Sequence, residues 1–263
     1  MMTQDFFLNP DHLQGTACFI SDTHFRTPQD QESWQRESLL VRFLEKEKID
    51  HLFLLGDIFD FWFEYADVAP KGYFRLFNLL HEMHEGGVNI YFFTGNHDMW
   101  VEDYFTKSFG CKVFREPHLF VLNGKRCLIG HGDGLGGKQP RYLFIKKVLG
   151  FGPDRFLYSL LHPRIAFAVA RRCSAHSRAS HPADVAVFRN EAEHQVMFAR
   201  ETLQNNDVDF FILAHRHIPV VYPLNTRSKL FNAGDWLDHF SYILFKAGES
   251  EPELHFYDTA NLS

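Results

Sequence analysis

The chain has 263 residues, enough for one large domain or two small ones, because single cores stop growing near roughly 250–300 residues. Apolar residues make up 45% and charged residues 23%, which excludes a disordered, collagen-like or coiled-coil protein. The net charge of −6 argues against nucleic-acid binding through a generally basic surface. We therefore expect one compact α/β domain spanning residues 1–263.

The first half of the chain alternates short apolar runs with helical patterns. Residues 16–21, 51–55 and 89–94 are apolar, rich in β-branched and aromatic side chains, and short enough for strands. Residues 38–48 and 73–83, which separate them, have the apolar spacing of helices. This β-α-β-α-β order predicts a central parallel sheet.

The pattern changes from about residue 112. Asn123-Gly124 separates two strand-like runs, and this dipeptide is the strongest short signal for a hairpin. We expect a second, partly antiparallel sheet to begin in this region. Further short strands are predicted at 210–215, 220–224, 229–234, 241–246 and 253–258. Helices on both outer faces would complete a four-layer α/β/β/α sandwich.

Residues 138–190 interrupt the strand pattern and predict a helical cap inserted into the domain. Pro153 and Pro163 both suit the first turn of a helix. The segment contains ten Lys and Arg residues against only two acidic ones, Asp154 and Asp184. Positive charge is therefore concentrated in the insertion.

The cysteines and the N-terminus bear on the compartment. The four cysteines lie far apart and form no C-x-x-C pair, which gives no support to a zinc ribbon, a redox motif or a disulfide framework. The N-terminus has no basic region followed by an apolar stretch, and no run of 18 apolar residues occurs. We expect a protein of the cytoplasm.

Five of the predicted strands, drawn from both sheets, are each followed by acidic, amide or imidazole side chains. Ligands of open α/β sheets bind beyond the carboxyl ends of the strands, so these side chains are expected to form one site. In chain order they are Asp22 and His24, Asp57 and Asp60, Asn96 with His97 and Asp98, His131, and His215 with His217.

The residue types are those of a centre for two metal ions. Imidazole and carboxylate ligands suit Mn, Fe or Zn, and the absence of thiolates argues against a structural zinc or iron–sulfur site. Two metal ions about 3.5–4 Å apart lower the pKa of a bridging water and stabilise both the attacking and the leaving oxygen of a phosphoryl displacement. The chemistry implied is hydrolysis of a phosphoester or a pyrophosphate.

The motifs D-x-H, G-D-x-x-D, G-N-H-D, G-H-G-D and H-x-H occur in this order, and this order resembles the calcineurin-like metallophosphoesterase family. The resemblance implies that Asp57 bridges two divalent metal ions. It also implies that His97 stabilises developing charge or protonates the leaving oxygen, oriented by Asp60 or Asp98. One ion would be bound by Asp22, His24, Asp57 and His217, and the other by Asp57, Asn96, His131 and His215.

A narrower resemblance, to the UDP-2,3-diacylglucosamine diphosphatases of lipid A biosynthesis, covers nearly the whole chain. It is carried by FISDTHF, LLGDIFDFWFEY, HGDGL and a basic insertion ending in ARRCSAHSRAS. The resemblance implies cleavage of a pyrophosphate to UMP and 2,3-diacylglucosamine 1-phosphate, manganese as the usual metal, and transient contact with the inner membrane. The substrate contacts it implies are Asn96, His97, Arg171, Arg172, Ser177 and Arg178.

One position departs from that narrower family, whose best-known branch has Arg in G-N-R-D where this chain has His97. Arg binds phosphate without giving up a proton, whereas His can act as an acid. A phosphodiesterase or nucleotide phosphatase acting on a soluble substrate is therefore the alternative. A non-catalytic scaffold of the same fold is a weaker alternative, because all seven ligand positions are filled.

The insertion has two interpretations. Its stretch FLYSLLHPRIAFAVARR places apolar side chains beside arginines, as a binder of a pyrophosphate with two acyl chains requires. Alternatively, the apolar side chains pack against the main domain and the basic ones form a solvated face. The apolar residues are Phe156, Leu157, Leu160, Leu161, Ile165, Phe167 and Val169, and the nearby arginines are Arg164, Arg171 and Arg172.

Overall fold

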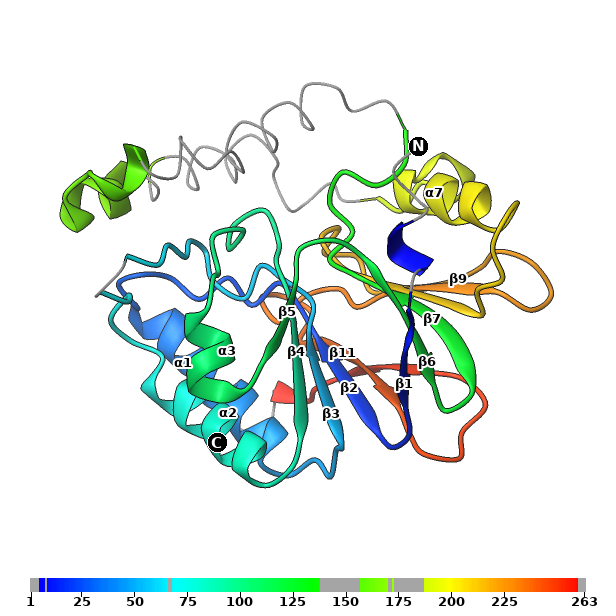
Figure 1. Cartoon of the computed structure of the whole chain (residues 1–263), viewed down its shortest axis with the longest axis horizontal. Helices are drawn as coiled ribbons and strands as arrows, with labels where there is room; N and C mark the ends of the chain where they lie inside the picture. Colours follow the sequence, from blue (N-terminus) through cyan, green and yellow to red (C-terminus); the bar gives the residue numbers. More distant parts are fainter. Residues whose placement is uncertain are drawn as a thin grey trace.

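Two six-stranded sheets pack face to face with helices outside them (Figure 1). The structure is a computed structural model that describes residues 5–7, 9–65, 68–137, 157–169, 172 and 187–259. This arrangement confirms the predicted α/β/β/α sandwich. Among the described residues, no helix combines the length and apolar character needed to cross a bilayer.

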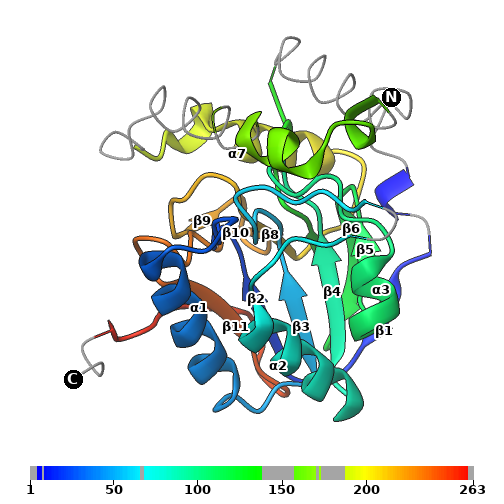
Figure 2. The same cartoon turned by 90° about the vertical axis from the view of Figure 1, so that its left-hand side faces the viewer.

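The first sheet contains the predicted parallel core. Its strand order is β12-β11-β2-β3-β4-β5, in which β2 to β5 run parallel and β11 is antiparallel to both its neighbours. The bounds are β2 Ala17–Ile20, β3 His51–Leu54, β4 Asn89–Phe93, β5 Lys112–Phe114, β11 Ser241–Phe245 and β12 Glu253–Phe256. Helices α1 (Gln31–Leu44), α2 (Phe74–Glu85) and α3 (Tyr104–Phe109) cover its outer face (Figure 2).

The second sheet is mixed, with the order β1-β6-β7-β8-β10-β9. Its hairpin forms as predicted, because Asn123 (φ 52°) and Gly124 (φ 77°) both adopt the left-handed backbone of a tight turn between β6 and β7. The bounds are β1 Asp11–Leu13, β6 His118–Leu122, β7 Lys125–Ile129, β8 Phe210–Leu213, β9 Val220–Pro223 and β10 Lys229–Asn232. Helix α7 (His194–Thr202) packs on its outer face, with the 3-10 helices η1 (Asp5–Phe7) and η3 (Asn190–Ala192) nearby.

The boundary between the sheets differs from the prediction in two respects. Strand β5, where the second sheet was expected to start, pairs with β4 and completes the edge of the first sheet. Strand β1 was not predicted at all, because it has only three residues and gains its strand conformation from pairing with β6. In both cases the pairing with residues distant in the sequence determines the sheet position of the strand, and the local sequence pattern does not contain this information.

Apolar side chains from both sheets form the central layer of the sandwich. Phe53 stacks between Phe19 and Tyr91, with ring centroids 4.7 and 4.5 Å apart, and meets Phe120 of the other sheet edge-on at 5.3 Å. These rings are buried, so the sheets are fixed to each other directly below the ends of β2, β3, β4, β7 and β8. The loops that follow these five strands share one edge of the sandwich.

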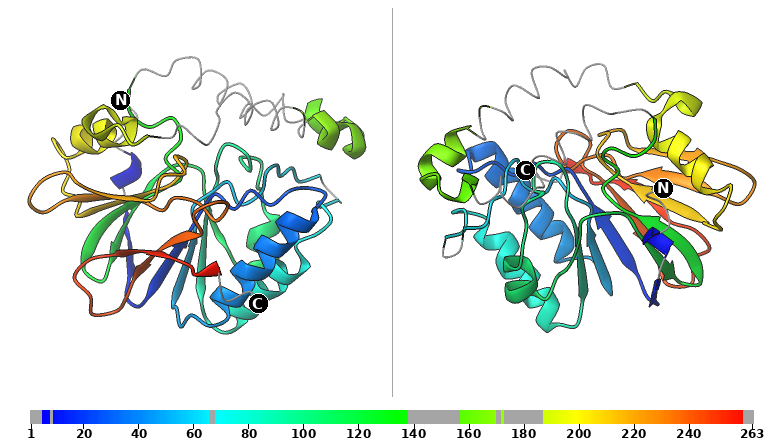
Figure 3. Two further views of the ribbon diagram at one scale, coloured as in Figure 1. Left: turned by 180° about the vertical axis from the view of Figure 1, so that it is seen from behind. Right: turned by 45° about the horizontal axis from the view of Figure 1, so that its top comes forward.

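Most of the predicted insertion, 138–190, lies outside the described residues. Within the described part, residues 157–159 and 163–169 are helical, and the second of these helices begins at Pro163 as predicted. Tyr158 and Phe167 contact Phe61, Phe63 and Trp100 of the main domain, a group we call the aromatic shelf. The described part of the insertion therefore rests on the loops that follow β3 and β4 (Figure 3).

Candidate metal centre

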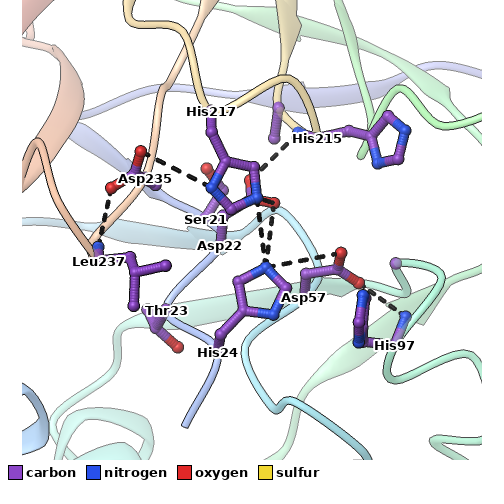
Figure 4. Close-up of polar contacts among 12 residues, drawn as sticks. Ser21, Asp22, Thr23, His24, Asp57, His97, His215, His217, Asp235 and Leu237 are labelled. Atoms are coloured by element: carbon purple, nitrogen blue, oxygen red, sulfur yellow. Dashed lines mark hydrogen bonds and ion pairs between the residues drawn. The ribbon is translucent and has the colours of Figure 1, made fainter. Parts of the chain in front are cut away.

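Five loops bring the predicted site residues together at the carboxyl edge of the sandwich, and Figure 4 shows six of them: Asp22, His24, Asp57, His97, His215 and His217. The loop after β2 carries Asp22 and His24, the loop after β3 carries Asp57, and the loop after β4 carries Asn96 and His97. The second sheet contributes His131 after β7 and His215 with His217 after β8. Strand ends that are far apart in the sequence thus supply one cluster, as the strand-end rule predicts.

Asp22, His24 and His217 form the first ligand group. Their ligand atoms all lie within 4.8 Å of one another. His217 Nε2 is 3.1 Å from Asp22 Oδ1, and the Nε2 atoms of His24 and His217 are 3.3 Å apart. Two imidazole nitrogens and a carboxylate that face one another at these distances can share one cation.

Asp57 joins this group to a second one formed with His131 and His215. Its Oδ2 atom lies 3.9 Å from His24 Nε2 and 3.4 Å from His131 Nε2. One carboxylate therefore faces imidazoles of both groups, which is the placement that a bridging ligand requires. His97 forms a third group with His24 and Asp57, so it lies beside the bridge.

Buried polar atoms at the centre fit divalent cations. Asn96 Oδ1 and His131 Nε2 are buried and make no hydrogen bond within the described part of the chain. Buried polar atoms are nearly always satisfied, and carboxylate, amide oxygen and imidazole together suit Mn, Fe or Zn. The residues that would hold two ions are the seven predicted ones: Asp22, His24, Asp57, Asn96, His131, His215 and His217.

The ligand loops adopt a backbone that is unusual for their residues. Five of the seven predicted ligands have left-handed φ values between 43° and 70°: Asp22, His24, Asp57, His215 and His217. Such conformations cost about 1–3 kcal/mol each and persist where the surroundings fix them. Glycines make the close approach possible, because a Cβ at Gly95 would collide with Asp57 Oδ1 and one at Gly56 would lie 2.7 Å from His131 Nδ1.

The electrostatics keep the carboxylates ionised. Burial by itself would raise the pKa of Asp22 and Asp57, but the surrounding imidazoles hold both well below the ordinary value. Burial and the nearby His131 lower the pKa of His215 to about 4. Two anionic carboxylates and a neutral His215 suit metal ligation, whereas, despite burial, the carboxylates raise the pKa of His24 and His131 to about 10, so these two imidazoles would release a proton when cations bind.

His97 is oriented by Asp60 and not by Asp98. Its Nδ1 lies 3.0 Å from the Asp60 backbone carbonyl and 3.9 Å from the Asp60 carboxylate. A carbonyl only accepts, so Nδ1–H donates, and Nε2 is the nitrogen left to exchange a proton. Asp60 Oδ1 also lies 3.7 Å from His24 Nδ1, so one carboxyl group serves two imidazoles.

Asp98 has a different position from the one predicted. Its carboxylate accepts hydrogen bonds from the backbone N–H groups of Asp57, Ile58 and Gly95 at 2.7 to 3.2 Å. This carboxylate is completely buried and ties the loop after β3 to the loop after β4. The resemblance implied that Asp60 or Asp98 orients His97, and among the described contacts of the His97 ring the structure gives Asp60.

Sequence reasoning missed Asp235, which follows β10. One carboxylate oxygen accepts the backbone N–H groups of Leu237, Asp238 and His239, and the other lies 3.7 Å from His217 Nδ1 (Figure 4). Carboxylates behind metal-bound imidazoles commonly fix their orientation. The available signal was an Asp directly after the predicted strand at 229–234.

The predicted substrate contacts of the insertion are only partly described. Arg171, Ser177 and Arg178 lie outside the described residues. Arg172 is described and exposed. Of the predicted substrate contacts, Asn96 and His97 are the two that the structure places at the centre itself.

Comparison with known proteins agrees with this geometry. Residues 16–219 match the calcineurin-like phosphoesterase family. The chain is 32% identical over 248 residues to a UDP-2,3-diacylglucosamine hydrolase of Porphyromonas gingivalis, covering 89% of this chain and 95% of that protein. Proteins of the same name from Aeromonas salmonicida and Stenotrophomonas maltophilia are 26% and 27% identical, covering 90% and 89% of this chain and 92% and 96% of theirs. The chain belongs to the calcineurin-like phosphoesterase family of metal-dependent hydrolases.

Proposed function

We propose that this enzyme hydrolyses the pyrophosphate of UDP-2,3-diacylglucosamine, releasing UMP and 2,3-diacylglucosamine 1-phosphate for lipid A biosynthesis. The proposal includes manganese as the metal and transient contact of a cytoplasmic protein with the inner membrane. The observation that carries it is an apolar, cationic insertion placed beside a phosphoester-hydrolysing centre. The names of the relatives point to the same substrate.

The centre supplies the groups that a pyrophosphate requires. Two bound cations would activate a water and stabilise charge on the phosphoryl oxygens. The protein's own contribution is to present the seven candidate ligands on five loops and to place His97 beside Asp57, the proposed bridge. With Nδ1–H held by Asp60, His97 Nε2 can protonate the departing phosphate oxygen.

The insertion supports a substrate with acyl chains. Tyr158 and Phe167 face inward and pack on the aromatic shelf. The ring centroid of Tyr158 lies 4.8 Å from that of Phe63 and 5.0 Å from that of Trp100. The outward side is also apolar, since Leu160 is 66% and Ile165 56% exposed. Exposed apolar side chains that lie close together are normally covered by a ligand, a partner or a membrane. Acyl chains, and the membrane surface from which they come, would provide such a cover. Arg164 and Arg172 of the same segment could bind phosphate.

The aromatic shelf connects the insertion to the chemistry. Phe61 follows Asp60 directly, and Trp100 lies three residues after His97. An acyl group held at the insertion would therefore leave its attached pyrophosphate within reach of the centre. This proximity favours a lipid nucleotide over a small soluble substrate.

The test is UMP release from UDP-2,3-diacylglucosamine in the presence of Mn²⁺, measured beside UDP-glucose and a simple phosphodiester. Turnover of the lipid nucleotide at a rate at least about 10²-fold above that of UDP-glucose is expected, since burial of each acyl CH₂ contributes about 0.8 kcal/mol. An Asp57→Asn variant is the control for contaminating hydrolases. Equal or faster turnover of the small substrates would overturn the lipid assignment and favour a phosphodiesterase or nucleotide phosphatase.

A further inference from the structure

The loop that carries His215 and His217 needs an external support. Both residues have left-handed backbone, with φ values of 70° and 52°, which non-glycine residues keep only where the surroundings impose it. The loop follows β8 directly, and Asp22 Oδ2 accepts the His215 backbone N–H at 3.1 Å. Further supports come from Asn232 of β10 and from the start of α7.

Gln195 of α7 holds the residue immediately before His215. Its Nε2 donates to the Ala214 carbonyl at 2.8 Å, and Asn232 Nδ2 donates to the same carbonyl at 2.9 Å. Asn232 Nδ2 also donates to Gln195 Oε1 at 2.9 Å, so the two amides fix each other. All of these groups are buried. A Cβ at Gly132 would collide with Gln195 Nε2. The residue after His131, a glycine, therefore leaves room for this amide.

Glu193 holds the residue between the two histidines. Arg216 Nε donates to its carboxylate at 2.7 Å and Nη2 at 3.5 Å. The Glu193 side chain is only 5% exposed, so the pair is screened far less than a surface ion pair. Glu193 is the N-cap residue of α7, yet its side chain makes no capping hydrogen bond. The usual role of an acidic N-cap residue therefore does not explain it.

We propose that Glu193 and Gln195 are positioning residues for the metal ligands His215 and His217. They act through Arg216 and the Ala214 carbonyl, one on each side of His215. Together with Asn232 they set the direction of the loop that delivers both imidazoles. The inference goes beyond the proposed substrate and rests only on the assignment of the ligands.

The test is Mn²⁺ binding to metal-free protein, followed by electron paramagnetic resonance of free and bound Mn²⁺ at a temperature where every variant is folded. Removal of a group that supports a metal ligand typically lowers the metal affinity by about 10–100-fold. We expect Glu193→Ala and Gln195→Leu to lose at least about 10-fold, and Glu193→Gln, which keeps an acceptor oxygen, to retain part of the affinity.

Glu191→Ala is the matched control. Glu191 lies two residues away and pairs with Arg200 at the surface, where the side chains are 60% and 43% exposed. Its described side-chain contacts, with Arg200 and Tyr222, involve no ligand loop. We expect its Mn²⁺ affinity to equal that of the unchanged protein.

A purely structural role would give a different result. If Glu193→Ala and Gln195→Leu lower the melting temperature while the Mn²⁺ affinity and spectrum stay unchanged, the inference is wrong. Should either variant fail to fold, Glu193→Gln and Arg216→Lys decide the question by the same criterion. Neither outcome depends on the identity of the substrate, which the hydrolysis assay tests separately.

Discussion

The metal centre and the described part of the insertion are incomplete in opposite ways. At the centre, polar atoms such as Asn96 Oδ1 and His131 Nε2 are buried without a hydrogen-bond partner among the described residues. In residues 157–169, apolar side chains such as Leu160 and Ile165 face solvent. Buried polar groups need a partner and exposed apolar groups need a cover. Two cations would satisfy the first group, and under the proposed function acyl chains would cover the second.

The two regions also differ in how they are held. The centre lies on loops fixed by buried hydrogen bonds, such as those of Asp98 to Asp57 and Gly95. The described insertion is held by ring contacts on the aromatic shelf and by a hydrogen bond of 3.4 Å from Tyr65 to the Leu161 carbonyl. Chemistry demands fixed geometry, whereas an acyl chain is recognised through area alone. The difference in construction is the one that the proposed division of tasks, chemistry at the centre and acyl-chain binding at the insertion, requires.

Replacement of Asp57, the proposed bridging carboxylate, should give the largest effect and should act on the metal centre alone. We expect Asp57→Ala to reduce hydrolysis to the background rate and to lower the content of both metal ions, because Asp57 faces both ligand groups. Metal analysis and UMP release measure the two effects. Asp103→Ala, which removes a carboxylate that is 65% exposed on the surface, is the control. Normal manganese-dependent turnover in Asp57→Ala would contradict the assignment of the bridge.

The role of His97 predicts a loss of rate without a loss of metal. We expect His97→Ala to slow hydrolysis by about 10²–10⁴-fold, as removal of a general acid does, while the bound metal stays unchanged. His12→Ala, at an exposed position of β1, is the control for a general effect of losing an imidazole. Loss of metal from His97→Ala would instead place His97 among the ligands, as its grouping with His24 and Asp57 permits.

Changes to the outward face of the insertion should affect only lipid substrates. We expect Leu160→Ser with Ile165→Ser to raise KM for the lipid nucleotide by about 10-fold or more, since a covered Leu or Ile contributes about 1.5–3 kcal/mol. Turnover of UDP-glucose, however slow, should stay unchanged. Phe74→Ser is the control, because Phe74 is an apolar side chain that is 79% exposed on α2, outside the insertion. An equal effect of all three changes on KM would remove the lipid role from this face.

The smallest effect is expected at the thiols of the sandwich. Burial raises the pKa of Cys111 to about 12 and also raises that of Cys18 and Cys127. At pH 8 the thiolate fraction at such a pKa is about 10⁻⁴, so iodoacetamide should leave these thiols unmodified until urea unfolds the protein. Peptide mass spectrometry checks this. Rapid modification of any of these three thiols in the native protein would show that its core opens readily.

The sequence alone predicted most of the fold and the candidate ligands, for a physical reason. Strand ends and ligand motifs are local, so Asp22, Asp57, Asn96 and His131 could be read from their places after apolar runs. The hairpin at Asn123-Gly124 was equally local, because a tight turn needs residues that accept left-handed backbone. The side chains that follow five strands come together at one edge because the strands of the sandwich end at that edge.

Tertiary structure alone decided what supports those ligands. Gln195, Glu193 and Asp235 lie in segments without a motif, and each acquires its role by touching a loop from another part of the chain. The same is true of Asp98, whose carboxylate serves the backbone of the loops after β3 and β4, and of β5, which joins the first sheet by pairing with β4. Sequence pattern records which side chains a strand end carries, whereas contacts between distant segments exist only once the sheets have packed.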